Sequence, residues 1–183
     1  MQKIMFNDRY HHTNAVIEER KTRATQIMAG IDFPVNMVMG RVLPDKDGKI
    51  YAVANGENII VKLRYKVGEV VAVAQCYNDV VREFTDLAFV PGSTNKMFVR
   101  ADLMPHQIRI IGIRCERLRD ISDEECIKEG VYAGSQALEY PYYFIDTKQF
   151  LICDYKSPRE AFAALIDKVS GRGTWDRNPW VVV

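Results

Sequence analysis

Short β-strand candidates follow one another along much of this sequence, each ended by residues that favour a turn. In the first half, the candidates 37–43, 49–54 and 58–63 are separated by the turn segments 44–48 and 55–56. The second turn is Asn55-Gly56, which favours a tight hairpin because both residues tolerate a positive φ. This pattern predicts a β-meander and limits the fold to one with many short strands.

Later strand candidates extend the pattern. Residues 70–74 form an unbroken apolar run, which suits a strand buried on both faces. Residues 107–118 are the longest candidate, and their alternation changes phase partway. A β-bulge near Gly112 would reconcile the two phases, although a strand buried on both sides would look the same. Further candidates are 97–100, a hairpin of 142–145 with 150–153, and a last strand in 178–183.

Three helices are predicted from their start signals. Asn7 or Asp8 could cap a helix that runs to about Arg20. Ser122 begins a capping box whose helix ends at Gly130. Ser157-Pro158 begins another helix with proline in its first turn, and an apolar stripe of Phe162, Leu165, Ile166 and Val169. Short strands with a few helices predict an α+β fold built on a small curved sheet or barrel.

Length and charge limit the possible partners. The 183 residues fit a single domain spanning 1–183. Hydrophobic residues make up 48% and charged residues 27%, which is ordinary for a globular domain. The formal net charge is +1, so the chain has no global basic field, and nucleic acid would have to contact a local patch.

Cofactor, metal and membrane signals are weak. The four cysteines form no C-x-x-C pair and fit reduced thiols in a cytoplasmic protein. The adjacent His11 and His12 would diverge on a helix, so no metal site is predicted. No nucleotide-phosphate, dinucleotide or common hydrolase motif occurs, and no cofactor is expected. The first residues have no apolar run of signal-peptide length, and no segment is long enough to span a membrane.

Two basic clusters are candidates for phosphate contacts, because guanidinium groups bind phosphate in a bidentate manner. Arg20, Lys21 and Arg23 form the densest cluster, with Thr22 between them. Arg114, Arg117 and Arg119 form the second. Tyr77 and Trp175 could stack on a base. Charges on an exposed face are usually only solvated, however, and a tryptophan is more often part of a core.

Several segments together resemble the ASCH domain family, as found in Bacteroides-like bacteria and their phages. They are the segments 19–22, 65–73, 113–118 and 121–130, then Trp175 with 178–181. The resemblance implies a PUA-like β-barrel with a cleft that receives RNA or a modified nucleoside. Residues 31–60 fit the family poorly and are predicted to be an insertion.

The resemblance also implies site residues. Some small ASCH proteins hydrolyse the acetyl amide of N4-acetylcytidine with a lysine, a threonine and a glutamate. The lysine corresponds to Lys21 and the glutamate to Glu129, whereas the threonine position holds Ala24. Either a bulge brings Thr25 to that place or the hydroxyl is missing, and the strand period favours its absence.

Three functions remain open from the sequence. The first is a module that binds RNA or a nucleotide in a cleft near Lys21 and Glu129. The second is a nucleoside amidohydrolase that uses these two residues for proton transfer. The third is a protein-interaction module of a phage or mobile element, with residues 37–63 as the docking surface.

Overall fold

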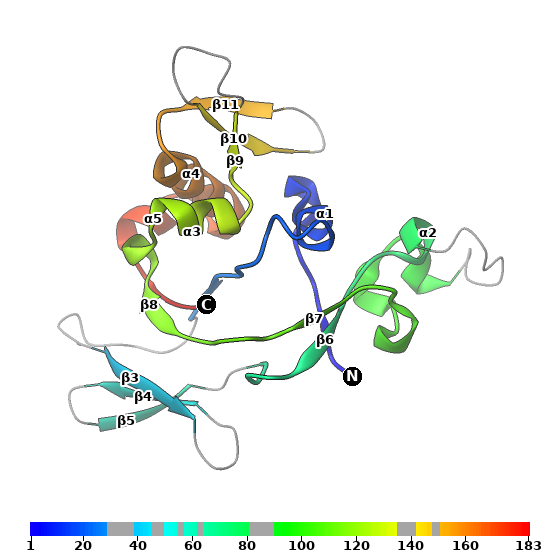
Figure 1. The fold of residues 1–183 in the computed structure, drawn as a ribbon, viewed down its shortest axis with the longest axis horizontal. Coiled ribbons are helices and arrows are strands. Elements are labelled where there is room, and N and C mark those ends of the chain that lie inside the picture. Colours follow the sequence, from blue (N-terminus) through cyan, green and yellow to red (C-terminus); the bar gives the residue numbers. More distant parts are fainter. Residues whose placement is uncertain are drawn as a thin grey trace.

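The computed structural model describes residues 1–28, 39–44, 50–54, 57–61, 64–80, 90–134, 142–147 and 151–183. In these ranges twelve short strands form four three-stranded sheets, with short helices around them (Figure 1). The predicted α+β class is confirmed. The strands of the described ranges do not close into a barrel. None of the helices in this part of the chain is long and apolar enough to cross a membrane.

The most deeply buried strand is β6 (Val70–Val73), as its unbroken apolar sequence predicts. It lies between β1 (Lys3–Ile4), which runs parallel to it, and β7 (Gln107–Arg109), which runs antiparallel. Val71 and Val73 pack with the N-terminal segment, whereas Ala72 packs with Tyr77 on the other face. The strand is therefore buried on both faces.

The predicted strand 107–118 is in fact two strands of different sheets. β7 ends at Arg109, and β8 (Cys115–Arg117) pairs with β12 (Trp180–Val182), which also pairs with β2 (Gln26–Ile27). The link between them crosses from one sheet to the other, and Ile111 within it is 88% exposed. The change of phase near Gly112 thus marks a change of sheet, and the predicted bulge is wrong.

A helical layer covers the third sheet, β9 (Tyr132–Ala133), β10 (Tyr143–Asp146) and β11 (Leu151–Tyr155) (Figure 1). This layer contains α3 (Asp123–Lys128), α4 (Pro158–Ser170) and α5 (Thr174–Arg177). From the predicted stripe of α4, Phe162, Leu165 and Ile166 join the core, whereas Val169 is 44% exposed. The stripe is thus narrower than predicted, and the short α5 was not predicted at all.

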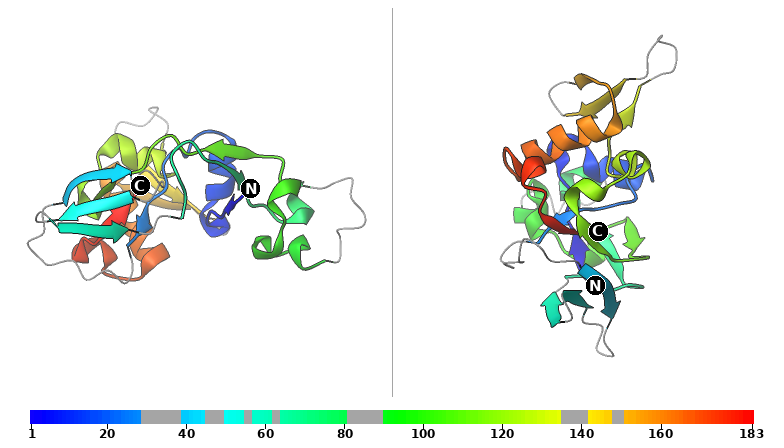
Figure 2. Two further views of the ribbon diagram at one scale, coloured as in Figure 1. Left: turned by 90° about the horizontal axis from the view of Figure 1, so that it is seen from below. Right: turned by 90° about the vertical axis from the view of Figure 1, so that its left-hand side faces the viewer.

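The predicted meander is confirmed as an antiparallel sheet of β3 (Met39–Pro44), β4 (Ile50–Ala54) and β5 (Glu57–Val61). Pro44, predicted to begin the first turn, is instead the last residue of β3 and pairs with Ile50, while the rest of that turn and the turn at 55–56 lie outside the described residues. The sheet lies beside β8 and at the opposite end of the molecule from α2 (Tyr77–Val80) (Figure 2).

The predicted strand 97–100 is wrong. Asn95 accepts a hydrogen bond from the Met97 amide and starts a 3₁₀ turn over Lys96–Phe98. The Lys3 ammonium donates to the Met97 and Val99 carbonyls at 2.6 and 2.7 Å, so a side chain satisfies groups that a neighbouring strand would otherwise satisfy. Two more 3₁₀ turns, Pro91–Ser93 and Ala101–Leu103, complete this region.

The helix starts follow their predicted signals. Asn7 accepts from the Arg9 amide before a 3₁₀ turn (Asp8–Tyr10) and α1 (His12–Ile17). This helix is shorter than the predicted one, which continued to about Arg20. The capping box of Ser122 and Glu125 is formed in both directions, and the chain turns away from α3 at Gly130, whose φ is +103°. Another 3₁₀ turn, Leu118–Asp120, precedes α3.

Gly130→Ala is expected to lower the free energy of unfolding by about 1–3 kcal/mol, because alanine rarely adopts so positive a φ. The added methyl group would also lie 3.3 Å from the imidazole Cδ2 of His12. Gly112→Ala is the matched control, since no atom lies within 4 Å of the new methyl group and no positive φ opposes it. Denaturant titration of both variants measures the difference, and equal stability would contradict the prediction.

Candidate functional site

The basic segment after α1 lies against the end of α3. The Lys21 amide donates to the Ala15 carbonyl at 2.9 Å, which keeps the segment close to α1. The next two amides, of Thr22 and Arg23, both donate to the Lys128 carbonyl, at 3.1 and 3.2 Å. The last carbonyls of a helix lack partners within the helix, so this contact also satisfies part of the α3 terminus.

A buried carboxylate, that of Glu129, holds this arrangement together. Its Oε2 atom lies 2.6 Å from the Lys21 ammonium, which also donates to the Glu129 carbonyl at 2.6 Å. The other oxygen, Oε1, accepts from Arg23 Nε at 3.2 Å and from the Thr25 hydroxyl. The side chains of Lys21, Glu129 and Arg23 are only 4%, 5% and 6% exposed, so the ion pairs are screened little by water.

Arg23 extends this cluster toward the surface. Its guanidinium pairs with Glu125 at 2.7 Å and with Glu116, and the half-exposed Arg114 pairs with the same two carboxylates. Three cations (Lys21, Arg23, Arg114) therefore meet three carboxylates (Glu116, Glu125, Glu129), and the cluster carries no net charge. The balance matters because a buried charge without a partner would be strongly destabilising.

His12 borders the cluster but carries no charge at neutral pH. Its side chain is buried beside Gly130. Burial, and then the nearby Lys21 ammonium, lower the pKa of His12 to about 3. The imidazole therefore adds no positive charge next to the lysine.

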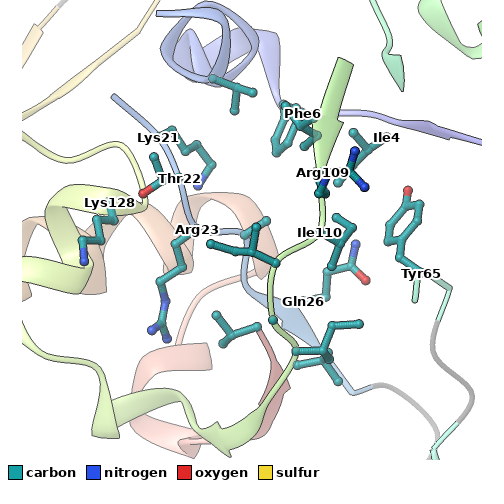
Figure 3. A pocket seen from close by; sticks show the side chains of 18 of the residues that line it. Ile4, Phe6, Lys21, Thr22, Arg23, Gln26, Tyr65, Arg109, Ile110 and Lys128 are labelled. Atoms are coloured by element: carbon teal, nitrogen blue, oxygen red, sulfur yellow. The ribbon is translucent and has the colours of Figure 1, made fainter. Parts of the chain in front are cut away.

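A pocket of about 860 Å³ opens beside the cluster (Figure 3). Lys21, Thr22 and Arg23 line one edge together with Lys128, and Arg109 and Tyr65 line another. Apolar side chains form much of the wall between the two edges: Ile4, Phe6, Val16, Ile108 and Ile110. The pocket thus combines an apolar wall with separate cationic edges.

The lining residues are strongly basic although the whole chain is nearly neutral. Six of the lining side chains are cationic and two, those of Glu19 and Glu125, are acidic, which gives a formal side-chain charge of 6 − 2 = +4; the cations are Lys21, Arg23, Arg64, Arg109, Arg114 and Lys128. Three of these form the ion pairs described above. The other three, Arg64, Arg109 and Lys128, form no salt bridge with any carboxylate of the described ranges.

The structure brings together most of the residues predicted from the first basic cluster. Lys21, Thr22 and Arg23 line the pocket, as does Arg114 from the second cluster. Arg20 does not line it: its guanidinium pairs with Glu18 at 2.6 Å and lies over the Tyr132 ring.

Thr25 contacts Glu129, although the strand period favoured its absence from the site. The reason is that residues 21–25 precede β2 and have no regular secondary structure, so alternation along a strand does not apply to them. Glu129 itself lies behind Lys21 and Arg23 and does not line the pocket.

The two predicted stacking residues lie elsewhere. Tyr77 is buried under Gly92, and its hydroxyl accepts from the Arg100 amide. Trp175 packs edge-on against Phe162 and is covered by the Arg159 guanidinium. Neither ring lines the pocket, so neither can stack on a ligand bound there.

Sequence reasoning missed several pocket residues. Glu125 lies four residues before Glu129, a spacing that puts both carboxylates on one face of α3, and this signal could have been read. Arg109 and Lys128 have no other basic residue within two positions, so no local pattern distinguishes them from solvated ones, whereas Arg64 lies between Lys62 and Lys66 in an alternating basic run that sequence reasoning passed over.

Within the ranges that the structure describes, no group of three or more histidine, cysteine or carboxylate side chains is arranged to hold a metal ion. Comparisons with protein-family models, with curated proteins and with solved structures found no match for this chain. The likeness to ASCH proteins therefore stays a hypothesis.

Glu129→Gln is expected to lower the free energy of unfolding by about 3 kcal/mol, because Lys21 would keep its burial and lose its only carboxylate partner among the described residues. Glu124→Gln, on the exposed side of α3, is the control, and it should change the free energy of unfolding by less than about 0.5 kcal/mol. Denaturant titration compares the two. A loss of equal size in both variants would show that the buried ion pairs contribute little.

Proposed function

We propose that the pocket binds a phosphorylated nucleoside, free or as part of a single-stranded RNA. The observation that carries this proposal is the pairing of an apolar wall with three cations, those of Arg64, Arg109 and Lys128, that form no salt bridge within the described part of the chain. Nucleotides have the complementary design, with a flat base and sugar attached to a phosphate.

The charge of the pocket supports an anionic ligand. A basic concave surface with low-dielectric walls raises the local concentration of anions. Lys21, Arg23 and Arg114 are held by carboxylates and would have to break ion pairs to serve a ligand fully. Among the residues that the structure places, Arg64 and Lys128 meet no carboxylate, although Arg64 lies over the Tyr65 ring, and Arg109 donates to the Gly68 carbonyl at 3.1 Å. These three cations could therefore bind phosphate without breaking an ion pair of the described ranges.

The apolar wall supports a ligand with a flat body. Phe6 and Ile108 belong to the core around β6, so the wall is backed by packed side chains. The Tyr65 hydroxyl donates to the Lys3 carbonyl at 3.1 Å, which fixes the ring at the edge of the pocket. A volume of about 860 Å³ lies within the range of small-molecule sites, which is roughly 300–1,000 Å³.

The resemblance to ASCH proteins adds a second line of support, since it implies a cleft for RNA or a nucleoside near Lys21. We propose on the same ground that the sheets of β6 and β12, which the segment 107–117 links, correspond to the core of a PUA-like fold. Of the segments quoted for the family, 65–73 reaches β6, 113–118 and 178–181 reach β8 and β12, and 121–130 contains α3, whereas 19–22 lies between α1 and β2 and Trp175 lies in α5.

Binding of nucleotides is expected to depend on phosphate and on salt. Guanosine and cytidine 5′-monophosphates should bind at least about tenfold more tightly than their nucleosides at low salt, because phosphate contacts release counterions. Lys128→Gln and Arg109→Gln each remove one unpaired cation, from different edges, and should weaken binding of a short RNA about three- to tenfold. Isothermal titration calorimetry at two salt concentrations measures both effects.

Lys168→Gln is the matched control, because Lys168 is exposed on α4 and does not line the pocket. It should bind like the wild type. The proposal is wrong if neither the mononucleotides nor the short RNA bind at low salt.

Hydrolysis of an acylated pyrimidine nucleoside is a second candidate, favoured by one observation. Lys21 and Thr25, both suited to proton transfer or hydrogen bonding, contact the same carboxylate of Glu129. In this reaction water adds to the acetyl carbonyl of N4-acetylcytidine, the C–N bond breaks, and acetate and cytidine leave. The ammonium at the pocket edge would supply the proton that the departing amine needs.

This candidate function predicts that the protein releases cytidine from N4-acetylcytidine. Chromatography of the reaction mixture measures the release. Lys21→Ala should abolish the release of cytidine. Lys128→Gln should retain most of it, since within the described ranges no hydrogen bond or ion pair joins the Lys128 ammonium to the Glu129 carboxylate. Circular dichroism checks that Lys21→Ala remains folded. Activity that survives in a folded Lys21→Ala variant would overturn this mechanism.

A further inference from the structure

Glu19 adopts an unusual backbone conformation at the pocket. Its φ is +59°, in the left-handed region that glycine and asparagine adopt easily and glutamate does not. Glu19 also lines the pocket. Strained backbone conformations of this kind are concentrated at functional sites.

The fold requires this backbone conformation but not this side chain. The Glu19 amide donates to the Val16 carbonyl at 3.1 Å, and the Arg20 and Lys21 amides both donate to the Ala15 carbonyl, at 2.8 and 2.9 Å. These bonds end α1 with a left-handed residue, a place where glycine is the most common choice. A glycine would therefore make the same backbone bonds with less strain.

The Glu19 carboxylate has no partner within the described part of the chain. It is exposed and forms none of the salt bridges or side-chain hydrogen bonds found there. Its neighbour Glu18 pairs with Arg20, and the other acidic residue of the lining, Glu125, pairs with Arg23 and Arg114. Glu19 is thus an uncommitted hydrogen-bond acceptor in a pocket whose other acidic residue, Glu125, is already paired.

We propose that Glu19 selects nucleobases that carry an exocyclic amino group. This inference rests on the proposed function and deepens it. Glu19 lines the same pocket as Val16 of the apolar wall, so its carboxylate is within the site against whose wall a base would lie. An ionised carboxylate only accepts hydrogen bonds, so it favours the amino groups of guanine and cytosine over the carbonyl of uracil.

The same carboxylate would also orient the ligand. It repels phosphate, while Arg64, Arg109 and Lys128 attract it. A nucleotide therefore gains most when the polar edge of its base faces Glu19 and its phosphate faces the unpaired cations. Binding in the reverse direction would place the phosphate beside the Glu19 carboxylate. It would also leave the amino group of the base without a hydrogen-bond acceptor.

Matched pairs of 5′-monophosphates test the inference by calorimetry. Guanosine and inosine monophosphates differ only by the 2-amino group, and cytidine and uridine monophosphates exchange an amino group for a carbonyl. The wild type should bind the amino member of each pair at least about tenfold more tightly. Glu19→Gln should reduce both preferences to about twofold, since an amide can donate as well as accept, whereas Glu18→Gln should leave them unchanged.

Glu19→Gly separates recognition from folding. This variant should lose the preference for the amino member of each nucleotide pair. It should also unfold at a temperature a few degrees higher than the wild type, because glycine relieves the strain at φ +59°. A lower unfolding temperature would show that the side chain serves the fold, and the inference would fail.

The remaining outcomes distinguish this inference from the proposed function. Equal binding of both members of each pair to the wild type would overturn the inference and leave nucleotide binding intact. Absence of all binding at low salt would overturn both. If Glu19→Gln instead removes a preference for ribose over 2′-deoxyribose, the carboxylate contacts the sugar, and the assignment to the base is wrong.

Discussion

The ion pair between Lys21 and Glu129 determines how the two halves of the site meet. It joins a segment near the N-terminus to the end of α3, more than one hundred positions later in the chain. Because both groups are nearly excluded from water, each stabilises the other's charge, and neither would be tolerated alone. Arg23 and Thr25 complete the coordination of the same carboxylate, so a single buried side chain fixes the whole basic segment.

This arrangement divides the cations of the pocket into two groups. Lys21, Arg23 and Arg114 are neutralised by carboxylates and maintain the shape of the site. Arg64, Arg109 and Lys128 line the pocket too, and no carboxylate in the parts of the chain that the structure covers neutralises them. Composition could not have shown the division, since the net charge of the chain is only +1. A local excess of positive charge is created by the folding of a nearly neutral sequence.

Local signals in the sequence predicted local structure well. The capping box of Ser122, the start of α4 at Pro158 and the buried strand β6 depend on neighbouring residues, and all three are confirmed. Features that depend on distant partners were predicted poorly. The 3₁₀ turn at Lys96–Phe98 replaces a strand because Lys3, far away in sequence, satisfies its carbonyls. Of the pocket cations, Lys21, Arg23 and Arg114 belong to basic clusters that the sequence showed, whereas Arg109 and Lys128 stand alone in the sequence and give no local signal.

The segment between β7 and β8 has a consequence for how this pocket could change its specificity. Residues 108–113 line the pocket and also connect two sheets, so a substitution there alters the wall and the placement of both sheets together. Glu19, Arg64 and Lys128 line the same pocket without contributing to a strand. Evolution, or a library of variants, can therefore adjust ligand preference at these three positions at little risk to the scaffold.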